Sequence, residues 1–230
     1  MLNKKTLKVI QSLNQISNKA IFSYPVTCVR EGKSIQAFLD MSKLDEEEFE
    51  SFGIFSLSDF LSAVSLIDNP EITLKEKAID IKNGKSSVVY RTSPIELLED
   101  ECQCDLKLLD RVKSNPKIGE FALSADEFKN LKIASNTLKD LPDLLISNTK
   151  SGISLKIIGR EKSSNSFETI IEGKVEEDFN LIANLALLKK VPNGDYKVEI
   201  FKSLKSESRI LLFKSENIES LEILFAVKQN

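Results

Sequence analysis

The feature that most constrains the fold of this chain is a repeated arrangement in which an amphipathic helix is followed by β-type segments. Helix starts are expected at four capping residues, which are Asn3, Ser56, Ser124 and Asp178. These starts lie 53, 68 and 54 residues apart. The nearly equal first and third spacings indicate a two-helix domain that occurs twice, with about 14 extra residues joining the copies.

The chain is long enough for two domains of roughly 110 residues, each with its own core. It has 230 residues, of which 41% are hydrophobic and 29% charged, as is typical of a globular protein. We therefore expect an α+β protein with an N-terminal domain over 1–110 and a C-terminal domain over 111–230. Helical periodicity fails over 93–117, where acids gather without a base between 96 and 105, so this stretch is expected to connect the domains.

Each copy is expected to contain two helices and several strands. Hydrophobic periodicity predicts helices over 1–18 and 56–68, from 124 onwards, and over 178–189. Turns are expected at the glycines Gly32, Gly84 and Gly152, each between two strand-like segments. The later strands are expected over 144–148, 153–158, 167–171, 196–201, 209–213 and 221–227.

Composition argues against an enzyme, a metal protein and a membrane protein. The chain has no histidine, which removes the commonest general base and transition-metal ligand. Its three cysteines, Cys28, Cys102 and Cys104, lack the partners of a zinc site and are expected to be reduced thiols. No catalytic residue, cofactor or metal site is therefore expected. The sequence also lacks a run of ~18 apolar residues or a secretory signal, so we expect a cytoplasmic protein without membrane contact.

Two patterns resemble parts of phosphate or metal sites. Gly-Lys-Ser occurs at 32–34 and 84–86, but a phosphate-binding loop needs a further glycine five residues earlier, where Thr27 and Ile79 stand. Both are expected to be hairpin turns. The acidic runs 45–50 and 96–105 are expected to be solvated loops, although a metal-dependent nuclease built on them remains the enzymatic alternative.

Lysines gather on predicted helix faces in a chain whose net charge is −3. The first helices of both halves carry a lysine stripe, whereas the acids cluster in loops and in the connector. Such a basic lining attracts a phosphate backbone without reading sequence, because lysine is a mobile point charge. The lysines expected to face such a nucleic-acid backbone are Lys4, Lys5, Lys8, Lys19, Lys129, Lys132, Lys139, Lys189 and Lys190.

Two segments carry a resemblance to a known family. The stretches 52–68 (FGIFSLSDFLSAVSLID) and 178–198 (DFNLIANLALLKKVPNGDYKV) resemble the DNA polymerase sliding clamps of T-even-like bacteriophages. Length and element order agree along the whole chain, and the likeness is weakest between 93 and 119.

The resemblance implies the DNA-clamp fold. In that fold, two similar domains each pack two inner helices on antiparallel sheets, and subunits close head to tail into a homotrimeric ring around DNA. It further implies a non-catalytic processivity factor for a DNA polymerase, loaded by a clamp-loader ATPase in the cytoplasm of an infected bacterium. A second role with late-transcription factors is left open. The non-enzymatic alternative is a DNA-binding module that forms no ring.

Further surfaces follow from the expected ring. Sheet edges that pair across subunits would be protected from other partners. The candidates for this interface are Phe167, Thr169, Ile171, Val88 and Tyr90. The final strand alternates incompletely, and we expect its residues Leu224, Phe225 and Val227 to line an apolar groove for partner proteins.

Overall fold

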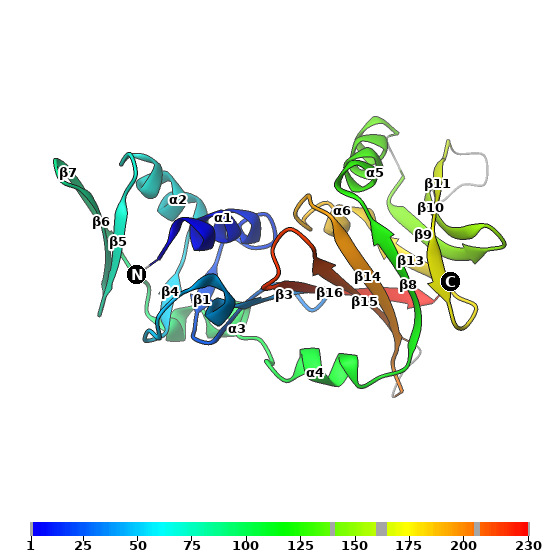
Figure 1. Ribbon diagram of the computed structural model, residues 1–230, viewed down its shortest axis with the longest axis horizontal. Coiled ribbons are helices and arrows are strands. Elements are labelled where there is room, and N and C mark those ends of the chain that lie inside the picture. Colours follow the sequence, from blue (N-terminus) through cyan, green and yellow to red (C-terminus); the bar gives the residue numbers. More distant parts are fainter. Residues whose placement is uncertain (1, 139–140, 160–164, 205–207, 230) are drawn as a thin grey trace. The chain divides into compact units, whose positions relative to one another are not determined.

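The computed structural model describes residues 2–138, 141–159, 165–204 and 208–229. The chain forms two compact units (Figure 1). Unit 1 comprises Met1–Gly32 and Gln36–Leu106, and unit 2 comprises Lys33–Ile35 and Lys107–Asn230. Within the described residues, no helix is long and apolar enough to cross a membrane.

Unit 1 contains two groups of strands, ordered β4-β1-β2-β3 and β5-β6-β7. Helices α1 and α2 lie on one side of β1–β4, and α3 lies on the other (Figure 1). The elements in chain order are α1 (Lys4–Leu13), β1 (Ala20–Phe22), β2 (Val26–Glu31), β3 (Ile35–Asp40), η1 (Met41–Leu44), β4 (Phe52–Ile54), α2 (Leu57–Ser65), β5 (Glu71–Lys75), β6 (Ala78–Asn83), β7 (Ser86–Arg91), η2 (Ile95–Leu97) and α3 (Glu99–Cys102).

The expected helix caps of unit 1 are confirmed, but both helices are shorter than predicted. The Asn3 side chain accepts hydrogen bonds from two backbone N–H groups of α1, and the Ser56 side chain accepts one from α2. After each helix, N–H groups bond to carbonyls three residues back, as at Ile16 and Ile67. These two side chains are buried, so the apolar period continues beyond the α-helical residues.

The Gly-Lys-Ser segments are hairpin turns, as the sequence predicts. Gly32 and Gly84 have φ of 56° and 39°, a region that favours glycine because it has no Cβ. Gly84 lies between the paired strands β6 and β7, in which Asn83 stands opposite Ser86. Neither turn leads into a helix, so neither cradles a phosphate in the manner of a phosphate-binding loop.

Unit 2 contains a nine-stranded sheet of order β11-β10-β9-β13-β16-β15-β14-β8-β12. Its recorded strand pairs are antiparallel. The elements are α4 (Leu108–Lys113), β8 (Lys117–Leu123), α5 (Ala125–Thr137), β9 (Asp143–Thr149), β10 (Gly152–Ile158), β11 (Phe167–Ile171), β12 (Gly173–Val175), β13 (Asn180–Asn184), α6 (Leu185–Leu188), β14 (Tyr196–Lys202), β15 (Arg209–Ser215) and β16 (Leu221–Gln229).

Helix α5 begins at the predicted capping box, in which the Ser124 and Glu127 side chains bond to each other's backbone N–H groups. The helix is held to the sheet by Phe128, which is fully buried. The Phe128 ring meets Tyr196 edge-on at 5.9 Å between centroids, and Phe213 lies within 6.4 Å. These aromatic contacts form the centre of the unit's core.

The predicted fourth helix over 178–189 is wrong. Residues Asn180–Asn184 form β13, which pairs with β9, and only the single turn α6 follows. The side chains of Leu181 and Ala183 are fully buried while their neighbours are not, which is the two-residue period of a strand. Asn184, rather than Asp178, caps the helix by accepting a hydrogen bond from Leu187 N at 3.1 Å.

The prediction of reduced cysteines is also wrong. Cys28 in β2 and Cys104 after α3 form a disulfide, although 76 residues separate them. Cys102 is the free cysteine and is buried. The sequence gives no sign of this link, because the fold alone brings β2 next to the residues that follow α3.

We predict that Phe128→Ala destabilises the protein by about 3–5 kcal/mol, because it removes the ring that joins α5 to the sheet and leaves a cavity. Urea unfolding followed by circular dichroism measures the loss. Asn130→Ala, at an exposed position of the same helix, is the matched control and should change stability by less than about 0.5 kcal/mol. Equal effects from the two variants would show that Phe128 does not anchor the helix.

Candidate nucleic-acid interface

Helix α1 presents a lysine face and contains no acidic residue. Thr6, Val9, Ile10 and Leu13 are buried, which leaves Lys4, Lys5 and Lys8 exposed. Lys5 forms a salt bridge of 2.8 Å with Asp45, which raises the pKa of its ammonium group. Within the described part of the chain, no carboxylate pairs with Lys4 or Lys8, so their positive charge remains available to an anionic ligand.

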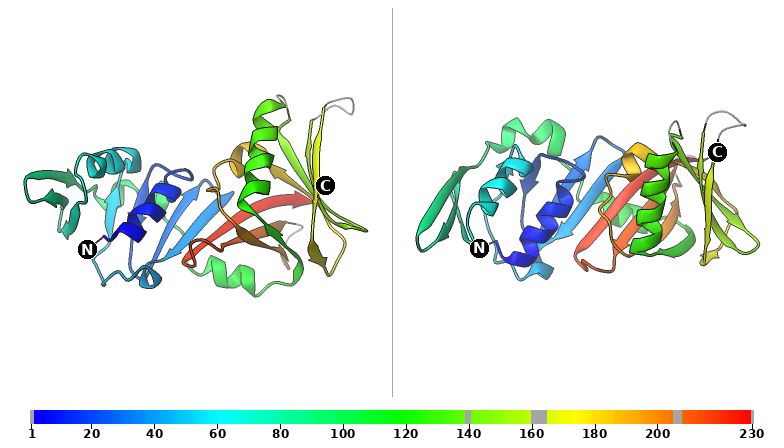
Figure 2. Two further views of the ribbon diagram at one scale, coloured as in Figure 1. Left: turned by 45° about the horizontal axis from the view of Figure 1, so that its top comes forward. Right: turned by 90° about the horizontal axis from the view of Figure 1, so that it is seen from above.

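Helix α2 lies beside α1 (Figures 1 and 2), and its exposed residues include the small polar Ser58, Ser62 and Ser65. Asn14, just after α1, donates a hydrogen bond to the Ser58 hydroxyl at 3.2 Å. The hydroxyls of Ser62 and Ser65 bond to carbonyls of their own helix at 2.8 and 2.7 Å. Short side chains that are already satisfied leave room for a bulky polymer to approach this surface.

Lys19 does not present a free charge. Its ammonium group lies 2.7 Å from a carboxylate oxygen of Glu101 and 4.5 Å from the centre of the Phe55 ring. The expectation that Lys19 faces DNA is therefore corrected: it binds a connector residue of its own unit. The sequence did not reveal this, because Glu101 lies 82 residues away.

In unit 2, the two described lysines of α5 have different roles. Lys129 is exposed. The expectation that Lys132 also faces DNA is wrong: its ammonium group donates a hydrogen bond to the Val191 carbonyl at 2.5 Å and lies 4.4 Å from the centre of the Phe128 ring. Burial lowers the pKa of Lys132 to about 8. Lys139, expected on the same stripe, lies outside the described residues.

The lysine pair after α6 is half-buried. The Lys189 ammonium group lies 3.5 Å from the Ser135 carbonyl of α5, to which it donates. Lys190 follows in the same turn, where its N–H donates to the Leu187 carbonyl. Lys189 thus links the end of α6 to α5. Among Lys129, Lys132, Lys189 and Lys190, Lys129 is the most exposed.

The strands expected at a subunit interface are both terminal strands of their sheets. β7 pairs with β6 and β11 pairs with β10. The outward side chains are, however, Val89 and Ile170, which are 55% and 51% exposed. Tyr90 instead points to α2, where its ring meets Phe60 edge-on and its hydroxyl donates to the Ser56 carbonyl.

On β11, too, the residues named from the sequence are less exposed than their neighbours Glu168 and Ile170. Ile171 is buried, whereas Phe167 and Thr169 are half-buried. The strands named from the sequence are terminal strands, but the residues named on them are the less exposed of the alternating sets, because the face of a strand is set by its register.

The residues predicted to line a partner groove on β16 are buried. The side chains of Leu224, Phe225 and Val227 are at most 4% exposed, and Phe225 packs against Phe213 at 6.4 Å. They belong to the core. Leu224 and Phe225 lie on opposite faces of this strand and both are buried, which accounts for the incomplete alternation, whereas Ala226 and Lys228 are exposed.

The described residues offer no group of three or more His, Cys, Asp or Glu side chains that could hold a metal ion. Acids of the connector lie in η2 and α3, and the acids at 45–50 follow the short 3₁₀ turn η1. The candidate site is therefore the set of lysine-bearing helices that lie on antiparallel strands.

Known proteins resemble this chain in sequence and in fold. No protein-family model matches the chain. The sliding clamp of Vibrio phage KVP40 is 24% identical over 208 residues, which cover 86% of this chain and 89% of the clamp. Among solved structures, PCNA from Entamoeba histolytica has a TM-score of 0.67 and 16% identity, covering 97% of this chain and 94% of its own.

A. fulgidus PCNA bound to the C-terminal region of FEN-1 has a TM-score of 0.65 and 12% identity, with coverage of 97% and 94%. The chain therefore has the fold of the ring-type DNA clamps. This fold is the one seen in PCNA, and the sequence of the chain is similar to that of a phage sliding clamp.

We predict that the half-buried Lys132 makes stability depend on pH. Its folded pKa of about 8 lies below the usual 10.5, so the unfolded chain binds more protons between these values and stability rises with pH across that window. Lys132→Met should abolish this contribution while keeping the packing on Phe128. Urea unfolding at pH 7 and pH 9.5 tests this, and parallel pH profiles for the two proteins would contradict it.

Proposed function

We propose that this protein is a sliding clamp of the T-even-like phage type, which encircles duplex DNA and holds a DNA polymerase on its template. The observation that carries the proposal is the likeness to sliding clamps along nearly the whole chain, in sequence and in fold. The lysine face of α1 and the exposed Lys129 of α5 support it, since both lie on helices of the kind expected to line a ring.

The DNA contacts in this proposal are electrostatic. Lys4, Lys8 and Lys129 are exposed and not paired with acids among the described residues, and each can approach a phosphate without contacting a base edge. The short hydroxyl side chains of Ser58, Ser62 and Ser65 on α2 would leave room for the duplex beside α1. A clamp needs such weak, sequence-independent contacts because it must move along DNA.

The assembly in this proposal is a head-to-tail homotrimer. The terminal strand β7 of one copy would pair with β11 of the next, which would protect two open sheet edges. The exposed apolar side chains Val89 and Ile170 on these strands support the pairing, as do Leu66 near the end of α2 and Ile133 on α5. Each copy carries both edges, so the contacts can close a ring.

The proposed clamp has no catalytic role. Its partners would be the DNA polymerase, a clamp-loader ATPase and, as a second role, late-transcription factors, all in the cytoplasm of the infected bacterium. A polymerase tail would bind elsewhere than at the buried residues of β16. The non-ring DNA-binding module and the nuclease are distinguished from this proposal by mass in solution and by incubation of DNA with Mg²⁺.

We predict a trimer of about 77 kDa, three times the 25.8 kDa chain, in light scattering at tens of micromolar. Ile170→Lys should shift the protein toward the monomer, because it places a charge on the outward face of β11. Val175→Lys, on the opposite terminal strand β12, is the matched control and should leave the mass unchanged. A 26 kDa species for the unaltered protein would argue against the ring.

We predict that Lys8→Ala lowers the salt slope of duplex-DNA binding by up to about one and weakens binding equally on all sequences. Lys132→Met should leave the slope unchanged, because the Lys132 ammonium group is held by Val191. Fluorescence anisotropy with two unrelated duplexes at several salt concentrations measures both. If Lys8→Ala weakened binding to one sequence alone, the lysine would be reading bases.

A further inference from the structure

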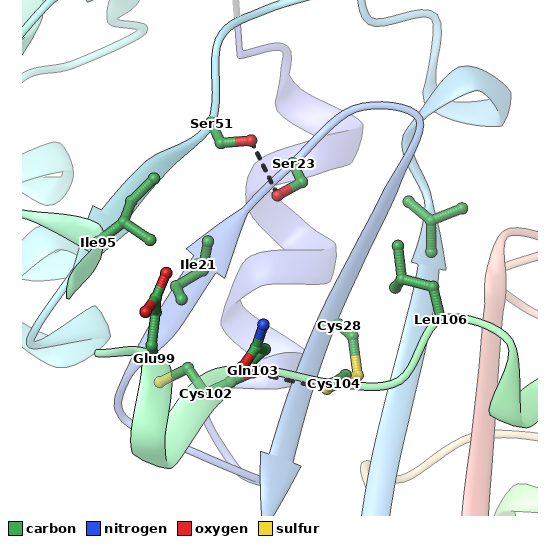
Figure 3. Close-up of a pocket in the computed structure, with 11 residues that line it drawn as sticks. Ile21, Ser23, Cys28, Ser51, Ile95, Glu99, Cys102, Gln103, Cys104 and Leu106 are labelled. Carbon is green, nitrogen blue, oxygen red and sulfur yellow. Dashed lines mark hydrogen bonds between the residues drawn. A yellow bond between two sulfur atoms is a disulfide. The ribbon is translucent and has the colours of Figure 1, made fainter. Parts of the chain in front are cut away.

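A pocket of about 290 Å³ lies in unit 1 beside the disulfide (Figure 3). Its walls come from β1, β2 and the segment that contains η2 and α3. We call residues 95–106 of this segment the strap. Ile21 and Val26 line one wall, and Ile95 and Leu106 of the strap line the other. All three cysteines border the same pocket.

The first part of the strap is held by several noncovalent contacts. Leu98 is fully buried and reaches so close to Gly53 that a Cβ there would lie 2.7 Å from its Cδ1. Arg30 of β2 donates hydrogen bonds to the carbonyls of Asp100 and Glu101, and Lys19 pairs with the Glu101 carboxylate. These contacts fix the strap as far as α3.

The last part of the strap is attached to β2 by the Cys28–Cys104 bond. Gln103, Asp105 and Leu106 around this bond are exposed, and the compact unit ends at Leu106. The disulfide therefore anchors the chain to β2 just before it leaves unit 1.

The three sulfurs differ in access. Cys104 is half-exposed at the pocket, whereas Cys28 and Cys102 are 6% and 3% exposed. Burial raises the pKa of the Cys102 thiol, so at neutral pH it stays protonated and does not attack the adjacent disulfide. Figure 3 shows the Cys102 sulfur directed away from the bonded pair. Of the two bonded residues, Cys104 is therefore the more accessible to an external thiolate.

We propose that the Cys28–Cys104 pair is a reversible thiol–disulfide modification site, whose reduction by a dithiol reductant releases the end of the strap from β2 and uncovers Cys102. The reductant's thiolate attacks the Cys104 sulfur, the S–S bond breaks, and Cys28 leaves as a thiolate that takes up a proton. The second thiol of the reductant then displaces Cys104, which is also protonated. The protein gains two electrons and two protons, and the reductant becomes a disulfide.

The site goes beyond the clamp function but suits the compartment proposed for it. Disulfides in a reducing cytoplasm are usually transient or redox-sensing, because thioredoxin-type dithiols reduce those that are accessible. The tests below measure thiols and backbone exchange without DNA or polymerase. Their failure would leave the clamp proposal untouched, and failure of the clamp proposal would leave the redox site standing.

The experiment compares the oxidised full-length protein with the same protein treated with thioredoxin and its reductase. Native alkylation with iodoacetamide followed by mass spectrometry should find all three cysteines protected before treatment and Cys104 labelled first afterwards. Hydrogen exchange in peptides covering 95–106 should become at least tenfold faster on reduction, while β5–β7 stays unchanged. A disulfide that is reduced only when the whole unit unfolds, or exchange rates that do not change, would overturn the proposal.

Two variants distinguish the effect of the Cys28–Cys104 disulfide from that of the free Cys102. Cys104→Ser removes the bond at the half-exposed position and should show the fast exchange of the reduced protein with or without thioredoxin. Cys102→Ala keeps the bond and should retain the full response. If Cys104→Ser exchanged as slowly as the oxidised protein, the bond would not hold the strap and the proposal would be wrong.

Discussion

Both units depend on the burial of one apolar helix face against antiparallel strands. In unit 1, Phe60 of α2 meets Tyr90 of β7 edge-on at 5.3 Å, and in unit 2, Phe128 of α5 meets Tyr196 of β14 edge-on at 5.9 Å. Both phenylalanines are fully buried. Burial of such rings supplies much of the hydrophobic driving force, and the edge-on geometry adds specificity. Since these contacts orient the helices, they also decide which side chains remain on the outer surface.

Charge pairing then decides which lysines can act on a ligand. Lys5 and Lys19 are neutralised by acids from loops and from the strap, and Lys132 is drawn into the core by a carbonyl and a ring. The exposed Lys4 and Lys8 keep their charge for a partner. The lysine surface of this acidic protein is thus smaller than its count of helical lysines suggests, which suits a ligand held weakly.

On strands β8, β14 and β15 of unit 2, by contrast, lysines pair with glutamates. Glu120 on β8 accepts from Lys117 at 2.8 Å and from Lys197 of β14 at 3.0 Å, which lowers the pKa of its carboxyl to about 2. Lys214 of β15 pairs with Glu199 in the next strand at 2.8 Å. Lys197 and Lys214 thus pair with glutamates of neighbouring strands, which distinguishes them from Lys4 and Lys8, with which no described carboxylate pairs.

The sequence alone determined what depends on local chemistry. Capping residues such as Asn3 and Ser124, the glycine turns and the amphipathic period predicted the helices α1, α2 and α5 and the hairpins. Only the tertiary structure decided what depends on distant neighbours. Pairing with β9 makes Asn180–Asn184 a strand, the register of β7 turns Tyr90 inward, and the fold brings Cys28 to Cys104. These outcomes involve partners tens of residues away, which no local pattern encodes.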